Sequence, residues 1–345
     1  MVTMETRYGI GLEALETLLE GQPAYRSRQI FEQLYSGLAA PEEMTNLPKD
    51  LRVSLETALP LALTEVAKSI TDDGETTKWA FSLEGGGAIE TVLMAYSDRV
   101  TACISSQAGC AMACSFCATG QGGFVRHLTT GEIVEQVVVA ARAALPRRLS
   151  NVVFMGMGEP MANYDAMMAA VRRIHGDIGI SARKITVSTV GIIPGIKRLT
   201  EEALPVNLAV SLHSANDQRR TALVPMNKRY PLSDLGDACL EYVETTNRRL
   251  SFEWALIDGV NDTDRDIQEL AAYARPLRAH VNLIPLNPTP GYLVRGSSRA
   301  RVGEFANALN ELGITTTIRA TRGSEIAAAC GQLAAPVTIQ KKVTS

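Results

Sequence analysis

Three cysteines lie close together in the chain, and their spacing points to a metal centre. Cys110, Cys114 and Cys117 form a C-x3-C-x2-C array. A structural zinc site needs four ligands in a closed tetrahedron, and the nearest further candidate, His127, lies ten residues beyond the array. Three thiolates suit a four-iron cluster in which one iron stays open to a small ligand. The array therefore favours a [4Fe–4S] cluster over zinc.

Polar residues follow the strands that are predicted after this array. Gly158 lets a ligand approach the backbone, and the Glu159 carboxylate can accept hydrogen bonds from an ammonium group. The ends of three later strands also carry polar residues, namely Ser188, then Ser211 with His213, then Asn287. Because the carboxyl ends of the strands meet at one mouth in a βα barrel, we expect a ligand site there.

From residue 100 onward, short apolar runs alternate with helical segments, which predicts repeated βα units and a parallel sheet, either a barrel or a doubly wound sheet. The clearest helix begins at Thr129, whose hydroxyl can cap it while Glu132 reaches back three residues later. The expected strands are Val100–Ser105, Val152–Met155, Ile185–Thr189, Val206–Leu212, Phe252–Ile257, Val281–Leu286 and Ile314–Ile318.

The first 97 residues follow other patterns. Residues 1–75 are predicted to form a helical accessory domain, because leucines recur at helical spacing from Leu12. Residues 76–97 predict a β-hairpin, in which apolar residues alternate from Trp79 to Leu83 and Gly85–Gly87 supplies the turn. The core barrel and a C-terminal segment are then expected over residues 98–345.

Composition limits the class of protein. Hydrophobic residues make up 46% and charged residues 21%, as in an ordinary globular protein. No signal peptide and no apolar stretch of about 20 residues is recognisable, so we expect a cytoplasmic protein with no membrane partner. Six cysteines in such a chain argue against a secreted disulfide scaffold.

Charge is unevenly distributed. The formal net charge of −3 argues weakly against a nucleic-acid partner. However, residues 142–229 contain 13 Lys and Arg but 6 Asp and Glu, a local balance of +7. Adjacent basic pairs recur through this region, which predicts a phosphate-facing surface.

The cysteine array, the Gly158-Glu159-Pro160 strand end and the Cys330–Leu333 segment together resemble the bacterial dual-specificity adenine-C2 RNA methyltransferases. These are radical S-adenosylmethionine enzymes that act on 23S rRNA and tRNA. The resemblance covers nearly the whole chain and is looser over the first 70 residues.

The resemblance implies an α/β fold with a partial (β/α)6 barrel of TIM type and an N-terminal RNA-binding domain. It also implies that Cys110, Cys114 and Cys117 hold a [4Fe–4S] cluster. The implied contacts of S-adenosylmethionine are Gly158, Glu159, Ser188, Ser211, Leu212, His213 and Asn287.

The same resemblance implies a mechanism with two S-adenosylmethionine molecules per turnover. One methylates Cys330, and the other is cleaved reductively at the cluster so that a methylene radical forms on the Cys330 sulfur. A radical is required because adenine C2, between two ring nitrogens, is too electron-poor to attack a sulfonium methyl group. Cys103 would then release the product and form a disulfide with Cys330, while Glu90 matches the family's acidic proton acceptor. Besides RNA, the implied partners are a one-electron donor such as flavodoxin and a thiol reductant.

Other functions fit parts of the pattern. Methylation at adenine C8, as in related resistance methyltransferases, would use the same cluster and both extra cysteines, although Pro160 and the Asn282–Asn287 segment look closer to the C2 group. A radical enzyme that modifies a small molecule is a third possibility. A zinc-bearing RNA-binding protein without catalysis would need only the cysteine array. Cys239, within a helical stretch, is expected to be a small buried hydrophobe.

Overall fold

The computed structural model describes residues 5–71, 73–287, 294–319, 323–328 and 331–333. Its framework is one ten-stranded sheet in the order β1-β2-β3-β4-β7-β8-β9-β10-β11-β12. From β4 onward, every neighbouring pair in this sheet is parallel. These parallel strands are β4 (Val100–Cys103), β7 (Asn151–Phe154), β8 (Ile185–Thr189), β9 (Asn207–Ser211), β10 (Leu250–Leu256), β11 (His280–Pro285) and β12 (Thr316–Ile318).

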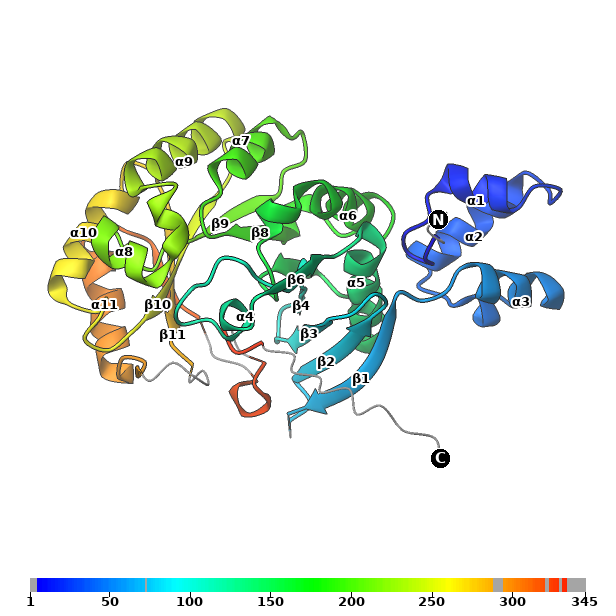
Figure 1. Cartoon of the computed structure of the whole chain (residues 1–345), viewed down its shortest axis with the longest axis horizontal. Helices are drawn as coiled ribbons and strands as arrows, with labels where there is room; N and C mark the ends of the chain where they lie inside the picture. Colours follow the sequence, from blue (N-terminus) through cyan, green and yellow to red (C-terminus); the bar gives the residue numbers. More distant parts are fainter. Residues whose placement is uncertain (1–4, 72, 288–293, 320–322, 329–330, 334–345) are drawn as a thin grey trace.

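Helices cover the outer side of the curved parallel sheet (Figure 1). Because the edge strands β1 and β12 do not pair with each other among the described residues, the barrel stays open. This is the partial barrel that the resemblance implies, whereas the βα pattern alone also allowed a doubly wound sheet. No helix within the described ranges is both long and apolar enough to cross a membrane. The helices of this part are α4 (Ala118–Gln121), α5 (Thr130–Ala144), α6 (Tyr164–Gly176), α7 (Ile193–Glu201), α8 (Asp217–Leu223), α9 (Leu232–Thr246), α10 (Asp264–Ala274) and α11 (Arg299–Glu311), with 3-10 turns η2 (Pro160–Asn163), η3 (Ala182–Lys184), η4 (Pro225–Lys228) and η5 (Ser324–Ile326).

Local sequence signals account for much of this framework. Each of the seven predicted apolar runs contains or overlaps a parallel strand. The predicted cap of α5 is confirmed, because the Glu132 amide donates to Thr129 Oγ1 (3.2 Å) and the Thr129 amide donates to Glu132 Oε2 (2.8 Å). This reciprocal pair satisfies two amides that a helix start otherwise leaves unbonded. Cys239 is fully buried in α9, as expected.

The N-terminal prediction is wrong in its extent. The helical part consists of α1 (Leu12–Leu18), α2 (Tyr25–Tyr35), η1 (Pro41–Glu43) and α3 (Lys49–Ala58), and Figure 1 shows it at one end of the molecule. Residues 63–70, which were expected to belong to it, instead form strand β1 (Leu63–Ile70). This strand lies at the sheet edge and is mostly exposed, so it lacks the alternation of apolar residues that marks a half-buried strand.

The predicted hairpin is confirmed as β2 (Thr76–Leu83) and β3 (Ala88–Ala95). Gly85, Gly86 and Gly87 have φ values of +79°, +98° and +90°, which only glycine adopts readily. The hairpin does not stand apart from the core, since β3 pairs with β4 in antiparallel register and β1 extends the same sheet. A further two-stranded sheet, β5 (Gln107–Gly109) with β6 (Phe124–His127), flanks the cysteine array.

Some basic residues of the region 142–229, which is predicted to form a phosphate-facing surface, contact other parts of the protein. Arg173 donates to the carbonyl oxygens of Gly9 (2.9 Å) and Ile10 (2.5 Å) and so joins α6 to the N-terminal helical part. Arg172 is paired with Glu202 (2.8 Å), and Arg220 is fully buried. Several of these charges are therefore used within the fold, which charge counting along the sequence cannot reveal.

Candidate active site

A pocket opens at the carboxyl ends of the parallel strands, where the barrel pattern predicts it. Its wall combines the cysteine array with residues from the ends of β7 to β11. The predicted site residues that line it are Cys110, Cys114, Cys117, Gly158, Glu159, Ser188, Ser211 and His213.

The loop that carries the three cysteines is held on two sides. The Cys110 amide donates to the carbonyl of Gly123 (2.8 Å), the residue directly before β6. On the other side, the Ser115 amide donates to Leu223 O (3.1 Å) at the end of α8. Burial raises the pKa of the Cys110 thiol to about 12 and also raises the pKa of Cys114. These thiols stay protonated unless a bound metal stabilises the thiolates.

The donor set fits an iron–sulfur cluster better than a single zinc ion. Three thiols face one pocket, but no three His, Cys, Asp or Glu side chains in the described part of the chain converge on one metal ion. A cubane cluster spreads its cysteine ligands over different irons, so their sulfur atoms need not converge. Cys110, Cys114 and Cys117 would thus hold the cluster and leave one iron without a protein thiolate.

Gly158 and Glu159, which follow β7, form another part of the pocket wall. Gly158 has φ +99°, and the Glu159 amide donates to Gln107 Oε1 (2.8 Å). The Glu159 carboxylate is almost fully buried and accepts hydrogen bonds from the amides of Met161 (3.0 Å) and Val190 (2.8 Å). Burial raises the pKa of Glu159 to about 7. The carboxylate therefore joins the ends of β7 and β8, and a ligand ammonium group would share its oxygens with these amides.

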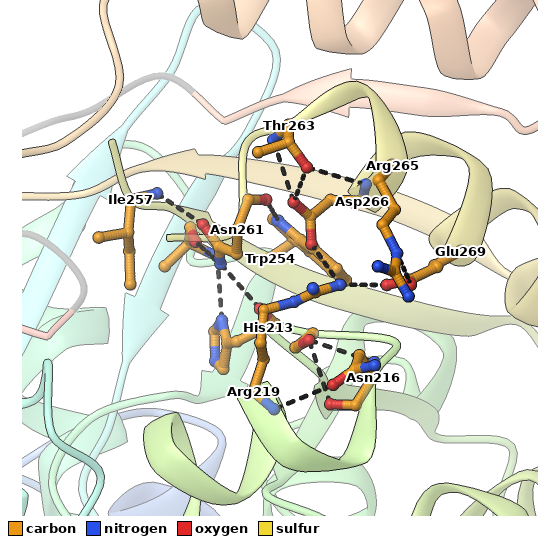
Figure 2. Close-up of polar contacts among 12 residues, drawn as sticks. His213, Asn216, Arg219, Trp254, Ile257, Asn261, Thr263, Arg265, Asp266 and Glu269 are labelled. Atoms are coloured by element: carbon orange, nitrogen blue, oxygen red, sulfur yellow. Dashed lines mark hydrogen bonds and ion pairs between the residues drawn. The ribbon is translucent and has the colours of Figure 1, made fainter. Parts of the chain in front are cut away.

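His213 follows β9 in a left-handed conformation (φ +56°), and its ring packs edge-on against Phe116 of the cysteine loop. Its Nδ1 accepts a hydrogen bond from the Ala255 amide (2.9 Å), which leaves the ring proton on Nε2. Burial lowers the pKa of His213 to about 3, so the ring is neutral at physiological pH. Asn261 fixes this turn by donating to His213 O (2.7 Å), as Figure 2 shows.

Two predicted contacts of S-adenosylmethionine do not line the pocket. The Leu212 side chain is fully buried in the core, so only its backbone faces the strand ends. Asn287 is buried two residues beyond β11, next to Leu286, which does line the pocket.

Cys103 and Glu90 lie on one face of the sheet. Cys103 is opposite Val92 on β3, and Glu90 is two residues before Val92, so the pleat places all three on the same face. Cys103 is also opposite Val153, which lines a cavity inside the barrel. Glu90 is buried and forms an ion pair with Lys78 (2.8 Å). Its second oxygen, Oε2, is buried without a hydrogen-bond partner among the described residues.

Cys330 itself lies outside the described residues, but the chain on either side of it is held. On one side, Lys78 donates to Ala327 O (3.2 Å). On the other, Gly331 O accepts from the amide of Ala118, which follows Cys117 (2.9 Å), and Leu333 O accepts from Thr119 Oγ1 (2.5 Å).

Comparison with known proteins agrees with this geometry. The radical SAM superfamily model matches residues 104–274. A probable dual-specificity RNA methyltransferase RlmN from Frankia casuarinae is 53% identical over 91% of this chain and 78% of its own length. Another, from a Mycobacterium species, is 50% identical over 91% of this chain and 90% of its own. The chain belongs to the RlmN family. A crystal structure of a radical SAM methyltransferase from Sphaerobacter thermophilus superimposes with a TM-score of 0.91 at 52% identity, covering 95% of this chain and 98% of that one.

As an RlmN-type protein, the chain is a radical S-adenosylmethionine RNA methyltransferase. Its cofactors are a [4Fe–4S] cluster and S-adenosylmethionine, and its substrate is RNA. This assignment disagrees with the zinc-bearing, non-catalytic alternative and agrees with the three-thiol pocket.

Sequence reasoning missed three charged residues at this RlmN site. Glu253 on β10 and Arg319 after β12 line the pocket and lie 3.7 Å apart. The signal for Glu253 was a carboxylate inside an otherwise apolar strand. Arg220 is the third, and nothing in its sequence context distinguishes it from its neighbour Arg219.

Gly158→Ala is expected to weaken binding of S-adenosylmethionine by more than about tenfold. A Cβ at this position would lie 2.5 Å from Gln107 Cβ and 2.7 Å from the Gln107 amide nitrogen, and the φ of +99° disfavours alanine as well. Equilibrium binding to the anaerobic, cluster-loaded protein measures the effect. Gly303→Ala is the matched control, because a Cβ there meets no atom within 4 Å and lies within α11. Equal affinity of the two variants would contradict the role given to the Gly158 loop.

Proposed function

We propose that this enzyme methylates C2 of adenine in 23S rRNA and tRNA, and that the new carbon reaches the RNA through Cys330. One observation carries this proposal: residues on both sides of position 330 are bonded to the elements that flank the pocket. The carbonyl of Ala327 accepts a hydrogen bond from Lys78. Lys78 on β2 is directly opposite Val92 on β3, and Val92 is directly opposite Cys103 on β4, so these three residues form one row across the sheet. Gly331 is bonded to the residue after Cys117. Ala327 and Gly331, which flank position 330 in the sequence, are thus bonded to the sheet row that contains Cys103 and to the end of the cysteine array.

Cys110, Cys114 and Cys117 would hold the [4Fe–4S] cluster, which with bound S-adenosylmethionine would supply one-electron chemistry and the radical that abstracts hydrogen. The residues of the chain account for the rest of the reaction. The thiolate of Cys330 first takes a methyl group from S-adenosylmethionine by displacement. After that methyl loses a hydrogen atom, its carbon bonds to adenine C2 and joins the protein to the RNA.

Release requires a base and a second thiol. The adduct would lose the C2 proton and return one electron to the cluster, which was oxidised when it supplied the electron for cleavage, and the aromatic ring is restored. The Cys103 thiolate then attacks the Cys330 sulfur, and the carbon–sulfur bond breaks with its electron pair left on carbon, which takes up a proton to become the methyl group. Cys103 can serve as the base before it becomes the nucleophile, and Glu90 is a proton acceptor on the same face, with its Oε2 available. A thiol reductant must reduce the resulting disulfide.

The N-terminal helical part is proposed to bind RNA. It is fixed to the core by Arg173, and the chain that leaves it is held by Glu135, whose carboxylate accepts from the amides of Ala62 (2.9 Å) and Leu63 (3.1 Å) at the start of β1. We further propose that the reaction takes place in the cytoplasm, where both RNA classes occur, with a donor such as flavodoxin. The target adenosine must be extruded from its stack to bring its ring edge to the pocket.

The position of methylation is tested by mass spectrometry of nucleosides. RNA from a strain lacking its own enzyme and complemented with this chain is digested and analysed. We expect 2-methyladenosine in both the 23S rRNA and the tRNA fractions. The appearance of 8-methyladenosine without 2-methyladenosine would favour the C8 alternative, and the absence of both would contradict the proposal.

A further inference from the structure

Arg220 is a fully buried arginine directly behind the S-adenosylmethionine pocket. It lies on α8, and its guanidinium donates to carbonyl oxygens at the ends of two neighbouring strands. The acceptors are Leu212 O (3.1 Å) and Ser211 O (3.3 Å) at the end of β9, and Val190 O (2.7 Å) after β8. These carbonyls belong to, or directly adjoin, the strand ends that line the pocket.

Glu159 also forms a hydrogen bond with one of these strand ends, that of β8. Val190 donates its amide to Glu159 and accepts from Arg220 with its carbonyl. A continuous set of hydrogen bonds therefore runs from the end of β7, through β8, to the end of β9. A single planar guanidinium can reach several carbonyls at fixed angles, which the flexible ammonium of lysine cannot reproduce.

The charge of Arg220 is not balanced by a direct ion pair. Within the described part of the chain no carboxylate lies within ion-pair distance of it. Its remaining side-chain acceptor is the neutral amide of Asn227 (Nη1 to Oδ1, 2.8 Å), and Asp217 is reached only through that amide (2.8 Å). A buried cation costs several kcal/mol unless an opposite charge compensates it. The fold thus keeps a positive charge that Asp217 compensates only at a distance, across the Asn227 amide.

A cluster bound to the cysteine array would supply a further negative charge near α8. Helix α8 contacts the array directly, since Leu223 O accepts from the Ser115 amide and the Leu223 side chain packs in one cluster with Cys110 and Cys114. Leu212, whose carbonyl accepts from Arg220, directly precedes His213, and the His213 ring packs against Phe116 between Cys114 and Cys117 (ring centroids 4.5 Å apart). Three cysteine thiolates give a bound [4Fe–4S] cluster a net negative charge, which increases when the cluster accepts an electron.

We propose that Arg220 is a positioning residue with two linked effects: it holds the ends of β8 and β9 in the shape that binds S-adenosylmethionine, and it supplies the fixed positive charge that stabilises the reduced cluster. The inference depends on the family's cofactors and not on which adenine carbon is methylated. It assigns Arg220 no contact with substrate.

Two substitutions separate these effects, and both are measured on the anaerobic, cluster-loaded full chain. Arg220→Gln removes the charge and most of the hydrogen bonds. It should lower the midpoint potential of the cluster and weaken binding of S-adenosylhomocysteine, a probe without a transferable methyl group, by more than about tenfold. Arg220→Lys keeps the charge, so the potential should stay near the wild-type value while affinity for the probe still falls. The potential is measured by redox titration followed by electron paramagnetic resonance.

Arg219→Gln is the matched control. Arg219 is the preceding residue on α8, but it points to Asp266 and Glu269 on α10, as Figure 2 shows. Its substitution should change neither the potential nor the affinity. Should Arg220→Gln not fold, Arg220→Met replaces it as the uncharged variant. A wild-type potential in the uncharged variant would refute the electrostatic effect, and wild-type affinity in Arg220→Lys would refute the positioning effect.

Discussion

Replacement of Cys330 by alanine is expected to abolish RNA methylation, with a fall of more than about a thousandfold. The sulfur carries the one-carbon unit in the proposed reaction, and each described cysteine has another place: Cys103 acts only in release of the product. Cys110, Cys114 and Cys117 belong to the cluster loop, and Cys239 is buried within α9. The measurement is transfer of label from methyl-labelled S-adenosylmethionine to RNA, together with release of 5′-deoxyadenosine.

This variant should keep its other activities. The described residues of the pocket wall are unchanged in this variant, so reductive cleavage of S-adenosylmethionine should persist without methyl transfer. Cys239→Ala is the control and should retain turnover, because the residue is a fully buried core side chain. Methylation by the Cys330→Ala protein at a rate near that of the control would exclude a carrier role for Cys330.

Replacement of Cys103 by alanine is expected to trap RNA covalently on the protein. The carbon–sulfur link between Cys330 and adenine can still form, because Cys103 acts only afterwards. It cannot be broken without a thiol that attacks the Cys330 sulfur. The product is a protein–RNA species that survives denaturing electrophoresis and is lost on treatment with ribonuclease.

The position of Cys103 makes this variant informative. The residue is buried at the end of β4, between Val92 and Val153, and loss of one sulfur atom there should leave the sheet intact. A large-to-small change of this size costs about 1 kcal/mol, which a protein of this size tolerates. Normal turnover and product release by Cys103→Ala would contradict its role as the resolving thiol.

Much of the framework was predictable because it depends on local signals. The capping pair Thr129 and Glu132, the glycine turn at 85–87 and the apolar runs of the parallel strands each specify structure over a few residues. The pocket residues were predictable for a related reason. A parallel barrel brings all its strand ends to one mouth, so Ser188, Ser211 and His213 meet there despite their separation in the chain.

Other features depend on contacts that no local pattern encodes. Strand β1 is stabilised by pairing at an exposed edge, and so its sequence lacks a hydrophobic alternation. Arg219 and Arg220 are adjacent and chemically identical, yet Arg219 forms partly buried ion pairs with α10 and Arg220 is buried behind the pocket. Glu159 was predicted to face a ligand ammonium, but its hydrogen bonds within the protein join two strand ends. Such roles depend on which backbone groups lie near each side chain in the folded protein.

The central claim is that RNA receives its carbon from the protein and not directly from S-adenosylmethionine. The most direct test is tandem mass spectrometry of the adduct trapped by Cys103→Ala, after digestion with protease and nuclease. We predict one cross-linked peptide in which the sulfur at position 330 is joined through a single methylene group to C2 of adenosine. A Cys103→Ala protein that carries no such peptide and still yields free methylated RNA would contradict the account.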